Sequence, residues 1–570
     1  MAEDPAAPSP APAHPPSGWR RLGAAALIIL ALIPVWQVVV KTADARRDIV
    51  YWDEFDTALS LILRLETGLA PAEFWREILE DNNGHRLAMS RLVFAAIYAA
   101  SGRINFASLD WIGNGTIAAA VLLAVFAAAG GARRLLLALL LSAAVFNLSH
   151  YENFLWSGSS IDHFTVVFLA TASLAALAAD RRAWSTAAVV LALMATLTLA
   201  HGLAVWPAGA LLLHAARRRR GLLVWTAAGT VATALFAAGL GSRQAELAAI
   251  VTPRGIWTAV HYWLSLLGAA PVLGWRTAAP YAGIVLLALL AVTRRRCGPR
   301  SEPLLGHLAV FAVLGAAVIA AGRSAQTGGE IHSRYLILGA FAWAITVFQL
   351  ISPPGGDARL ARRFALVLPC VAAFHFAANR EFADEVDSWL TCRDLATVAY
   401  IQHGTDGRGP FSLHPRADHS TRLLRAAARS GVHELEEVCR EEPFPREARE
   451  SASIAYHVEE VAVTARSAAI RGWAGIPGRR FARGAIHVVL EAGGIRRTYQ
   501  AVTVPRSDVP AVMHRPEWDR AGFHFAREIS DLPAGEFRVG LLVEDQDRTE
   551  FVMTGAMLRL PPAAPLAGQQ

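Results

Sequence analysis

The chain has 570 residues, of which 54% are hydrophobic and only 18% are charged, and its formal net charge is +7. Soluble proteins carry about a quarter charged residues, so a wholly soluble protein is excluded. The basic surplus does not indicate nucleic-acid binding, because much of it lies in short arginine clusters beside apolar runs, where it orients membrane helices. These apolar runs fill residues 22–380, whereas residues 381–570 have the composition of a soluble protein.

The N-terminal segment, residues 1–19, is rich in proline and alanine and is predicted to be a disordered cytoplasmic tail. An apolar run, Leu22–Val40, follows directly after Arg20 and Arg21. A cleaved signal peptide is the alternative, because residues 43–45 resemble a cleavage site. The run is longer than the roughly 7–15 residues of a signal core, so we favour an uncleaved first membrane helix.

Eleven apolar runs approach the length of about 20 residues that a membrane helix needs. They are 22–41, 110–130, 134–149, 162–179, 184–200, 203–216, 221–241, 277–293, 304–321, 335–351 and 364–379. The segments 85–101 and 255–275 are interrupted by polar residues and are predicted to be amphipathic or half-inserted helices on the outer face. With this assignment all arginine clusters lie in one compartment, the cytoplasm, together with the N-terminus. Residues 381–570 then lie on the opposite, non-cytoplasmic side of the membrane.

Polar and charged residues gather in the loops on this outer side, and at membrane depth such residues tend to mark functional cavities. In chain order they are Asp53, Glu54, Asp56, Asp81, His85, Arg86, Arg91, Glu152, Asn153, Trp156, Asp162, His163, His201, Arg323, Glu330, His332, Arg334 and Tyr335. A carboxylate can act as a general base toward an acceptor hydroxyl, and guanidinium and imidazole groups can hold a phosphate. This combination predicts transfer of a sugar from a lipid-phosphate donor.

The acidic cluster has two other interpretations. Its three carboxylates could cap the helix that begins near Thr57, because acids favour helix N-termini. His85 with Asp53 and Asp56 could instead bind a divalent cation, although their spacing matches no dedicated metal motif. We therefore predict that no cofactor is required, and we leave open whether the site binds a divalent cation.

The other polar residues also have structural interpretations. Arg86 and Arg91 could extend to the headgroups of the surrounding membrane lipids. Trp156 could belong to the interfacial aromatic belt, and Arg334 could anchor its helix at the interface. His201 could be a buried, hydrogen-bonded histidine.

The arrangement resembles the GT-C superfamily of membrane glycosyltransferases, in which an acidic residue or Asp-Glu pair occupies the first outer loop. Asp53 and Glu54 match that pair, and helical segments near 57–66, 72–80 and 86–100 match the juxtamembrane helices of the superfamily. A closer resemblance is to bacterial O-antigen serotype-converting glucosyltransferases. The motifs that carry it are DNNGHR at Asp81–Arg86, YENFLW at Tyr151–Trp156, AHGLAVWP at Ala200–Pro207 and GRSAQTGGEIHSRY at Gly322–Tyr335.

This resemblance covers about residues 20–380 and implies a GT-C-like bundle in the bacterial inner membrane. The implied reaction is inverting hexosyl transfer from a polyprenyl-phosphate-linked sugar to a cell-surface glycan or lipid-linked acceptor. Asp53 is then the general base, with Glu54 or Asp56 as alternates. The chain departs from the family at Gly84, where a glutamate is usual. Any chemical role of that glutamate is therefore either absent from this chain or taken by Asp81.

Eleven residues are the predicted binding groups for the donor phosphate and the rest of the substrate. They are His85, Arg86, Arg91, Glu152, Asn153, Trp156, His201, Arg323, His332, Arg334 and Tyr335. Two other classes of function stay open, a transporter or flippase for lipid-linked sugars and a non-catalytic glycan-binding scaffold. Against transport, the sequence shows no repeat of broken helices and no charges deep within the spans.

The soluble part divides into a helical periplasmic connector, 381–450, and a segment of short alternating strands, 451–562, which predicts an antiparallel β-sandwich. Trp473, Trp518 and Phe523 could form a carbohydrate-binding face, although core packing is the more common role of such residues. Cys392 and Cys439 both lie in this outer compartment and are predicted to form a disulfide, with two free thiols as the alternative.

Overall fold

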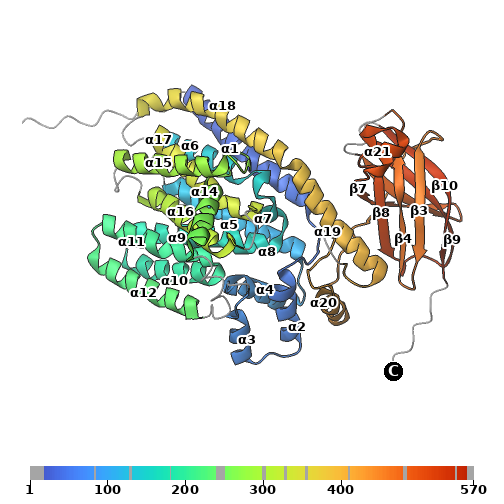
Figure 1. Cartoon of the computed structure of the whole chain (residues 1–570), viewed down its shortest axis with the longest axis horizontal. Helices are drawn as coiled ribbons and strands as arrows, with labels where there is room; N and C mark the ends of the chain where they lie inside the picture. The colour runs from blue at the N-terminus through green and yellow to red at the C-terminus, as the bar shows by residue number, and fades with distance from the viewer. Residues whose placement is uncertain are drawn as a thin grey trace, which may run out of the picture.

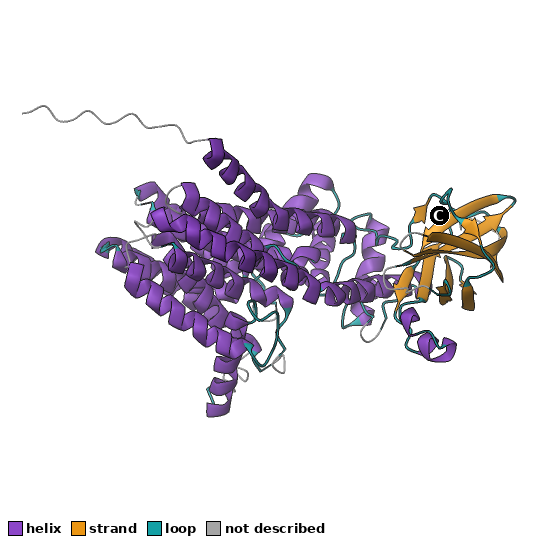
Figure 2. Cartoon of the chain, turned by 90° about the horizontal axis from the view of Figure 1, so that it is seen from above, coloured by secondary structure: helices purple, strands orange, loops and turns teal. Residues whose placement is uncertain are grey.

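The computed structural model consists of a large helical part and a β domain, which are joined through helix α19 (Ala383–His403) (Figure 1). It describes residues 18–82, 85–127, 131–179, 181–238, 251–297, 303–325, 330–352, 357–407, 411–478, 484–545 and 548–561. Nearly all of the predicted N-terminal tail, and Gly84 in the first loop, lie outside these described residues. Figure 2 shows that the strands are confined to one end of the molecule.

Helices make up the chain as far as residue 430, and several are linked by single π or 3₁₀ turns, labelled η. In chain order they are α1 (Gly18–Ala45), η1 (Phe55–Leu59), α2 (Ser60–Glu66), α3 (Pro71–Ile78), α4 (Ala88–Ser101), α5 (Phe106–Ala127), α6 (Gly131–Val145), η2 (Leu148–His150), α7 (Tyr151–Leu155), α8 (Ser157–Ser159), η3 (Ser160–Phe164), α9 (Thr165–Ala178), α10 (Arg182–Thr198), η4 (Ala200–Ala204), α11 (Val205–Ala215), α12 (Arg219–Ala238), α14 (Pro253–Gly268), α15 (Ala279–Cys297), α16 (Pro303–Arg323), η6 (Ser333–Tyr335), α17 (Leu336–Ile351), α18 (Asp357–Glu381), α19 and α20 (Ala417–Ser430). The turns η1, η2, η4 and η6 coincide with the loops in which the candidate polar residues were predicted.

Six described helical segments are long and apolar enough to cross a membrane, so the chain has the character of a membrane protein. They are Ala25–Ala45, Phe106–Ala127, Ser157–Ala178, Arg219–Ala238, Pro303–Arg323 and Ser333–Ile351. A seventh span results if Arg133–Val145 and Leu148–Leu155, which meet at a 53° bend, are counted together.

The predicted number of eleven spans is therefore too high by this measure. Helix α11 has 11 residues, about 16 Å of helix against a hydrocarbon core of about 30 Å. Helix α15 has three arginines in its last turn, and α18 carries charged residues at both ends. In α10 only Trp184–Thr198 forms a short apolar helix.

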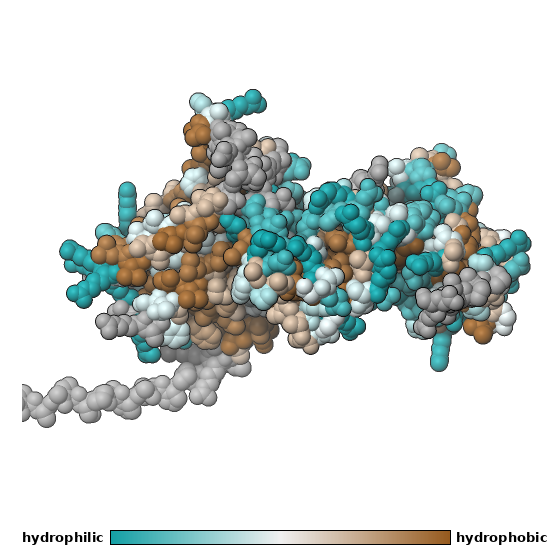
Figure 3. Space-filling model, turned by 90° about the horizontal axis from the view of Figure 1, so that it is seen from below, coloured by the Kyte–Doolittle hydropathy of each residue, from teal (hydrophilic) through white to brown (hydrophobic). Residues whose placement is uncertain are grey.

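The surface of the helical part is hydrophobic where it faces outward. On α12 the side chains of Leu223, Val224 and Leu235 are 72%, 65% and 65% exposed. Figure 3 shows hydrophobic residues gathered over the helical part and hydrophilic residues over the half that holds the β domain. An exposed apolar surface of this extent fits contact with lipid and would be costly in water.

One hydrophobic core links the first loop to the soluble part. Buried residues of the loop and η1, including Val50 and Phe55, belong to the same packed cluster as Leu413 and Leu424 of the connector and the core of the β domain. The guanidinium of Arg393 on α19 donates hydrogen bonds to the carbonyl oxygens of Ala45 (2.8 Å) and Leu155 (3.2 Å). The connector is thereby fixed against the ends of α1 and α7.

The β domain contains two sheets that share a core. Its strands are β1 (Glu441–Glu442), β2 (Arg449–Glu450), β3 (Ala455–Val463), β4 (Ser467–Gly475), β5 (Ala485–Ala492), β6 (Ile495–Gln500), β7 (Val502–Val504), β8 (Gly522–Glu528), β9 (Gly535–Asp545) and β10 (Arg548–Leu560), and α21 (Asp508–Met513) and η7 (Pro516–Trp518) lie between β7 and β8. The strand orders are β1-β6-β5-β9-β10-β2 and β3-β4-β8-β7. All pairs are antiparallel except β2 with β10.

The aromatic residues that could have formed a carbohydrate-binding face belong to this core. Trp518 is 1% exposed and Phe523 is completely buried, and the ring of Trp473 lies 6.1 Å from that of Trp518. Gly475 leaves the space for Trp518, since a Cβ atom there would lie 2.8 Å from the indole ring. Core packing is therefore the role that the structure gives these residues.

The predicted disulfide between Cys392 and Cys439 is wrong, because both thiols are free. Cys439 is completely buried, and its sulfur lies 4.0 Å from the carbonyl oxygen of His524. Cys392 is half-buried on α19 and lines a cavity. A disulfide was possible because both cysteines were predicted to lie in the same outer compartment. In the structure, however, Cys439 is buried whereas Cys392 lies at the wall of a cavity.

Thiol labelling of the folded protein should distinguish the two cysteines. Burial raises the pKa of Cys439 to about 12, so little reactive thiolate is present at neutral pH. N-ethylmaleimide at pH 7 should therefore modify Cys392 while leaving Cys439 unmodified until the protein unfolds. Peptide mass spectrometry measures both sites, and a disulfide-linked peptide containing Cys392 and Cys439 would contradict the structure.

Candidate functional site

A cavity of about 330 Å³ brings together candidate residues that are far apart in the sequence. The predicted residues that line it are Asp53, His85, Trp156, His201, Arg323, Arg334 and Tyr335. Its apolar wall comes from α12 and α16, with Phe236, Val318 and Ile319 among the lining residues. The cavity therefore combines acidic, basic and apolar surfaces.

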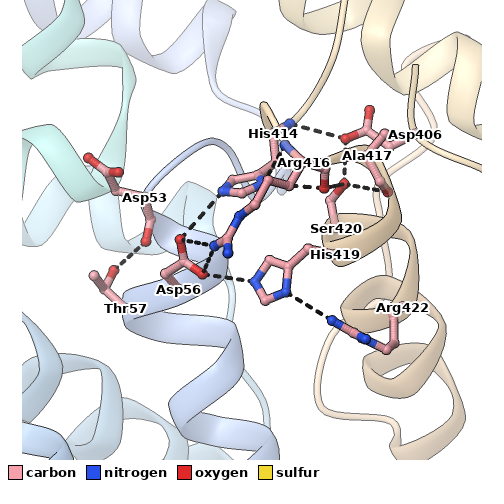
Figure 4. Close-up of polar contacts among 10 residues, drawn as sticks. All are labelled: Asp53, Asp56, Thr57, Asp406, His414, Arg416, Ala417, His419, Ser420 and Arg422. Atoms are coloured by element: carbon pink, nitrogen blue, oxygen red, sulfur yellow. Dashed lines mark hydrogen bonds and ion pairs between the residues drawn. The ribbon is translucent and has the colours of Figure 1, made fainter. Parts of the chain in front are cut away.

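Asp53 presents its carboxylate to this cavity without a protein hydrogen bond. It precedes η1, where its backbone carbonyl accepts hydrogen bonds from the N–H and the hydroxyl of Thr57, at 2.9 and 2.8 Å. Among the described residues no donor bonds to the carboxylate, which is directed away from Asp56 (Figure 4). Burial raises the pKa of Asp53, while the charges of Arg334 and Arg323 oppose this increase.

Glu54 has a structural role. Its completely buried side chain accepts hydrogen bonds from the Tyr51 N–H (2.8 Å), the Gly158 N–H (2.7 Å) and the hydroxyl of Ser157. Burial raises its pKa to about 7. Since all of these donors belong to the protein, the carboxylate joins the first loop to α8 and is not directed at a ligand.

Asp56 is bound by the connector. Its carboxylate accepts two hydrogen bonds from Arg416 Nη2 (3.0 and 3.1 Å) and one from His419 Nε2 (2.8 Å), and His414 Nε2 lies 3.4 Å away (Figure 4). Hydrogen bonding to His414 and the charge of Arg416 outweigh burial and hold the pKa of Asp56 at about 2. Glu54 and Asp56 are therefore poorly placed as the alternative bases that the sequence allowed.

A buried carboxylate positions Arg334 beside the cavity. Glu152 accepts hydrogen bonds from Arg334 Nη1 (3.0 Å), the Arg334 N–H (3.1 Å) and Ser333 Oγ (3.0 Å). Asn153 Nδ2 donates to the carbonyl oxygen of Arg334 (2.9 Å). The guanidinium carbon lies 5.5 Å from the centre of the Trp156 ring. Glu152 and Asn153 are thus positioning residues behind the cavity wall, whereas they were predicted to contact substrate.

Arg323 and His85 form a second basic group in the cavity. Arg323 Nη2 lies 3.0 Å from His85 Nε2. Because a guanidinium only donates hydrogen bonds, His85 Nε2 is the acceptor in this contact. The cavity thus contains two guanidinium groups on different helices, both within electrostatic reach of Asp53.

Besides Glu152 and Asn153, three more predicted binding residues lie outside the described lining of the cavity. The Nη1 atom of Arg86 donates to the carbonyl oxygen of Leu79 (2.6 Å). That of Arg91 donates to the carbonyl oxygens of Glu80 (2.6 Å) and Arg86 (3.0 Å). Both arginines therefore stabilise the loop before α4. His332 packs near Tyr335, with ring centres 6.0 Å apart.

Two lining residues, Asp162 and His163, were recognised among the outer polar residues of the sequence but were given no catalytic or binding role. Asp162 accepts a hydrogen bond from Ser90, and His163 stacks on His201 with ring centres 5.8 Å apart. A carboxylate and an imidazole at the start of an apolar helix could have identified these two residues as part of the site, because ionisable groups at membrane depth tend to be functional. The apolar wall from α12 had no signal, because its residues resemble those of any membrane helix.

The structure does not assemble the metal site that His85, Asp53 and Asp56 could have formed. Asp56 is engaged by the connector, and His85 is bound to Arg323. Across the described parts of the chain, no group of three His, Cys, Asp or Glu side chains could hold a metal ion.

Comparison with known proteins gives no direct assignment. No known protein family, curated protein or solved structure matches this chain. The function must therefore be inferred from the cavity, its charges and the exposed apolar surface that surrounds it.

The Asp56 cluster should stabilise the folded protein in a pH-dependent way. Because the pKa of Asp56 is about 2 in the folded state and about 3.9 in an unfolded chain, the stabilisation is present above pH 4 and is lost as the pH falls toward 2. Asp56→Asn should lower the free energy of unfolding by about 1–2 kcal/mol at pH 6, and less at pH 3. Thermal unfolding in detergent, with the exposed Asp44→Asn as control, measures this. A difference that does not change with pH would contradict the assignment.

Proposed function

We propose that this chain is a membrane glycosyltransferase that transfers a sugar from a polyprenyl-phosphate donor to a glycan or lipid-linked acceptor. The observation that carries the proposal is the partly buried Asp53 carboxylate, which has no hydrogen bond to a described protein group and faces a cavity containing Arg334 and Arg323. A base opposite a phosphate-binding pair is the arrangement that such a transfer needs. The resemblance of the loop motifs to GT-C enzymes points the same way.

In the proposed reaction Asp53 accepts the proton of the acceptor hydroxyl as its oxygen attacks the anomeric carbon of the donor sugar. The bond from that carbon to the phosphate oxygen breaks, and its electron pair leaves with the polyprenyl phosphate. Arg334 and Arg323 stabilise the negative charge that develops on the phosphate. The raised pKa of Asp53 makes it a better proton acceptor than an exposed aspartate.

The apolar wall of the cavity supports a lipid-linked donor. Phe236 on α12 and Ile319 on α16 belong to helices long and apolar enough to cross a membrane. An isoprenoid chain could therefore lie against hydrophobic side chains while its phosphate meets the two arginines. A nucleotide sugar would gain nothing from this wall.

The orientation and compartment belong to the same proposal. We infer that the Asp53 cavity opens on the periplasmic side of a bacterial inner membrane, with the N-terminus in the cytoplasm. The support is the distribution of the arginine clusters beside the apolar runs of the sequence.

Asp53→Asn should abolish sugar transfer while leaving donor binding intact. Loss of a general base lowers turnover by about 10²- to 10⁴-fold, whereas an asparagine keeps the size of the side chain. Purified protein in detergent, tested with a panel of polyprenyl-phosphate sugars, gives thermal shift for binding and product formation for turnover. Asp44→Asn is the matched control. Turnover by Asp53→Asn would exclude this base, and no stabilisation by any donor would favour a transporter or scaffold.

Arg334→Lys should weaken donor binding by about 10- to 100-fold, because an ammonium group cannot reproduce the two-point contact of a guanidinium with phosphate. Glu152→Gln should have a smaller effect, since the amide keeps part of the hydrogen bonding to Arg334. Titration of the donor with thermal shift measures both. The control is Arg276→Lys, which changes an exposed outer arginine. Equal donor affinity in Arg334→Lys and Arg276→Lys would contradict the assigned role.

A further inference from the structure

A second cavity, of about 840 Å³, lies between helix α19 and the four-stranded sheet of the β domain. It is larger than the Asp53 cavity, and its size falls in the range of small-molecule and oligosaccharide sites, which favour domain junctions. One wall is formed by α19, with Thr391, Leu395 and Gln402 among its residues. The other comes from β4, β8 and the segment between β7 and β8.

Several polar side chains in this cavity have no partner in the protein. Gln402, Asp519, Arg520 and His524 all line it, and in the described structure none of their side chains makes a hydrogen bond or an ion pair. Amide, carboxylate, guanidinium and imidazole groups are well suited to bidentate and mixed donor–acceptor contacts with vicinal hydroxyls. A ligand can therefore form hydrogen bonds with these groups without first breaking hydrogen bonds within the protein.

The charges around the cavity are balanced. Arg471 pairs with Glu460 at 2.8 Å, and Arg506 pairs with Asp508 at 2.6 Å and with Glu459 at 2.7 Å. Burial lowers the pKa of His524, which keeps the imidazole neutral at pH 7. Asp519 and Arg520 contribute one charge of each sign. A neutral polyhydroxylated ligand therefore fits better than a polyanion.

One end of the cavity is connected to the loop that carries Asp53. Phe411, which is 45% exposed, lines the cavity. Two residues further on, the carbonyl oxygen of Leu413 accepts a hydrogen bond from the Trp52 N–H (2.8 Å), next to Asp53. The next residue, His414, lies 3.4 Å from Asp56. The segment that follows Phe411 thus links the rim of this cavity to the loop that carries Asp53.

We propose that the cavity between α19 and the four-stranded sheet binds a neutral oligosaccharide segment of the acceptor glycan. Gln402, Arg520 and His524 bind its hydroxyls, and the exposed ring of Phe411 supports a sugar face at the rim of the cavity. Calling this oligosaccharide the acceptor rests on the proposed glycosyltransferase function. The proposal that the cavity binds a neutral oligosaccharide does not depend on that function.

The test is binding of neutral linear hexasaccharides of glucose, mannose and galactose to the full-length protein in detergent, measured by isothermal titration calorimetry. Arg520→Ala and His524→Ala should each weaken binding of the preferred hexasaccharide by about tenfold, because each removes a hydrogen-bonding group. The control is Arg559→Ala, whose exposed side chain lies on β10 of the other sheet, and it should bind as the unmodified protein does. Unchanged thermal unfolding shows that each variant is folded.

Binding of a neutral hexasaccharide that falls in both cavity variants and persists in Arg559→Ala supports the proposal. Absence of binding by all three sugars overturns it, as does equal binding by every variant. Binding only of a uronic acid hexasaccharide, or only of a peptide, also overturns it. In an assay of sugar transfer, Arg520→Ala should raise the KM for the acceptor by about tenfold and leave kcat unchanged. Failure of donor binding at Asp53 would overturn the proposed function while leaving hexasaccharide binding unaffected.

Discussion

The buried carboxylate of Glu54 is the interaction on which the arrangement of the site depends. It satisfies two backbone N–H groups and a hydroxyl, and thereby fixes the first loop against the start of α8. With Glu54 held, its neighbours Asp53 and Asp56 must face different surroundings, one the cavity and the other the connector. Three acids within four residues thus have three separate roles. Removing the anchor would free the loop and with it the direction of both other carboxylates.

The second constraint is the cost of keeping an arginine ordered beside an apolar cavity. Burying a charge is expensive unless it is paired and hydrogen-bonded. Glu152 meets that requirement for Arg334 by accepting a hydrogen bond from the guanidinium, while two further hydrogen bonds, from Ser333 Oγ and the Arg334 N–H, hold the carboxylate in place. The guanidinium is consequently in place before any ligand arrives. Preorganisation of this kind reduces the reorganisation that a phosphate would otherwise require.

Hydropathy and the order of polar loops predicted much of the architecture, including the apolar helices, the switch from helix to strand near residue 451 and most of the charged and imidazole side chains of the cavity. Periodicity could not show that Asp56 is bound by Arg416 and His419, since that contact joins positions 360 residues apart. Nor could it distinguish Arg91, which binds backbone carbonyls, from Arg334, which lines the cavity. Counting apolar runs overestimated the spans, because a run such as α11 is apolar but short. These properties depend on tertiary contacts and not on residue type.

Helix α19 follows α18 after a single intervening residue, Phe382, and leads to the β domain (Figure 1). Its 21 residues correspond to a rod of about 32 Å. Along this length, residues from Asp384 to His403 line the second cavity, and Arg393 in the middle of the helix binds the ends of α1 and α7. The helix therefore forms a wall of the second cavity and is at the same time fixed to the helical part. Any tilt of this rod against the membrane helices would change the width of that cavity.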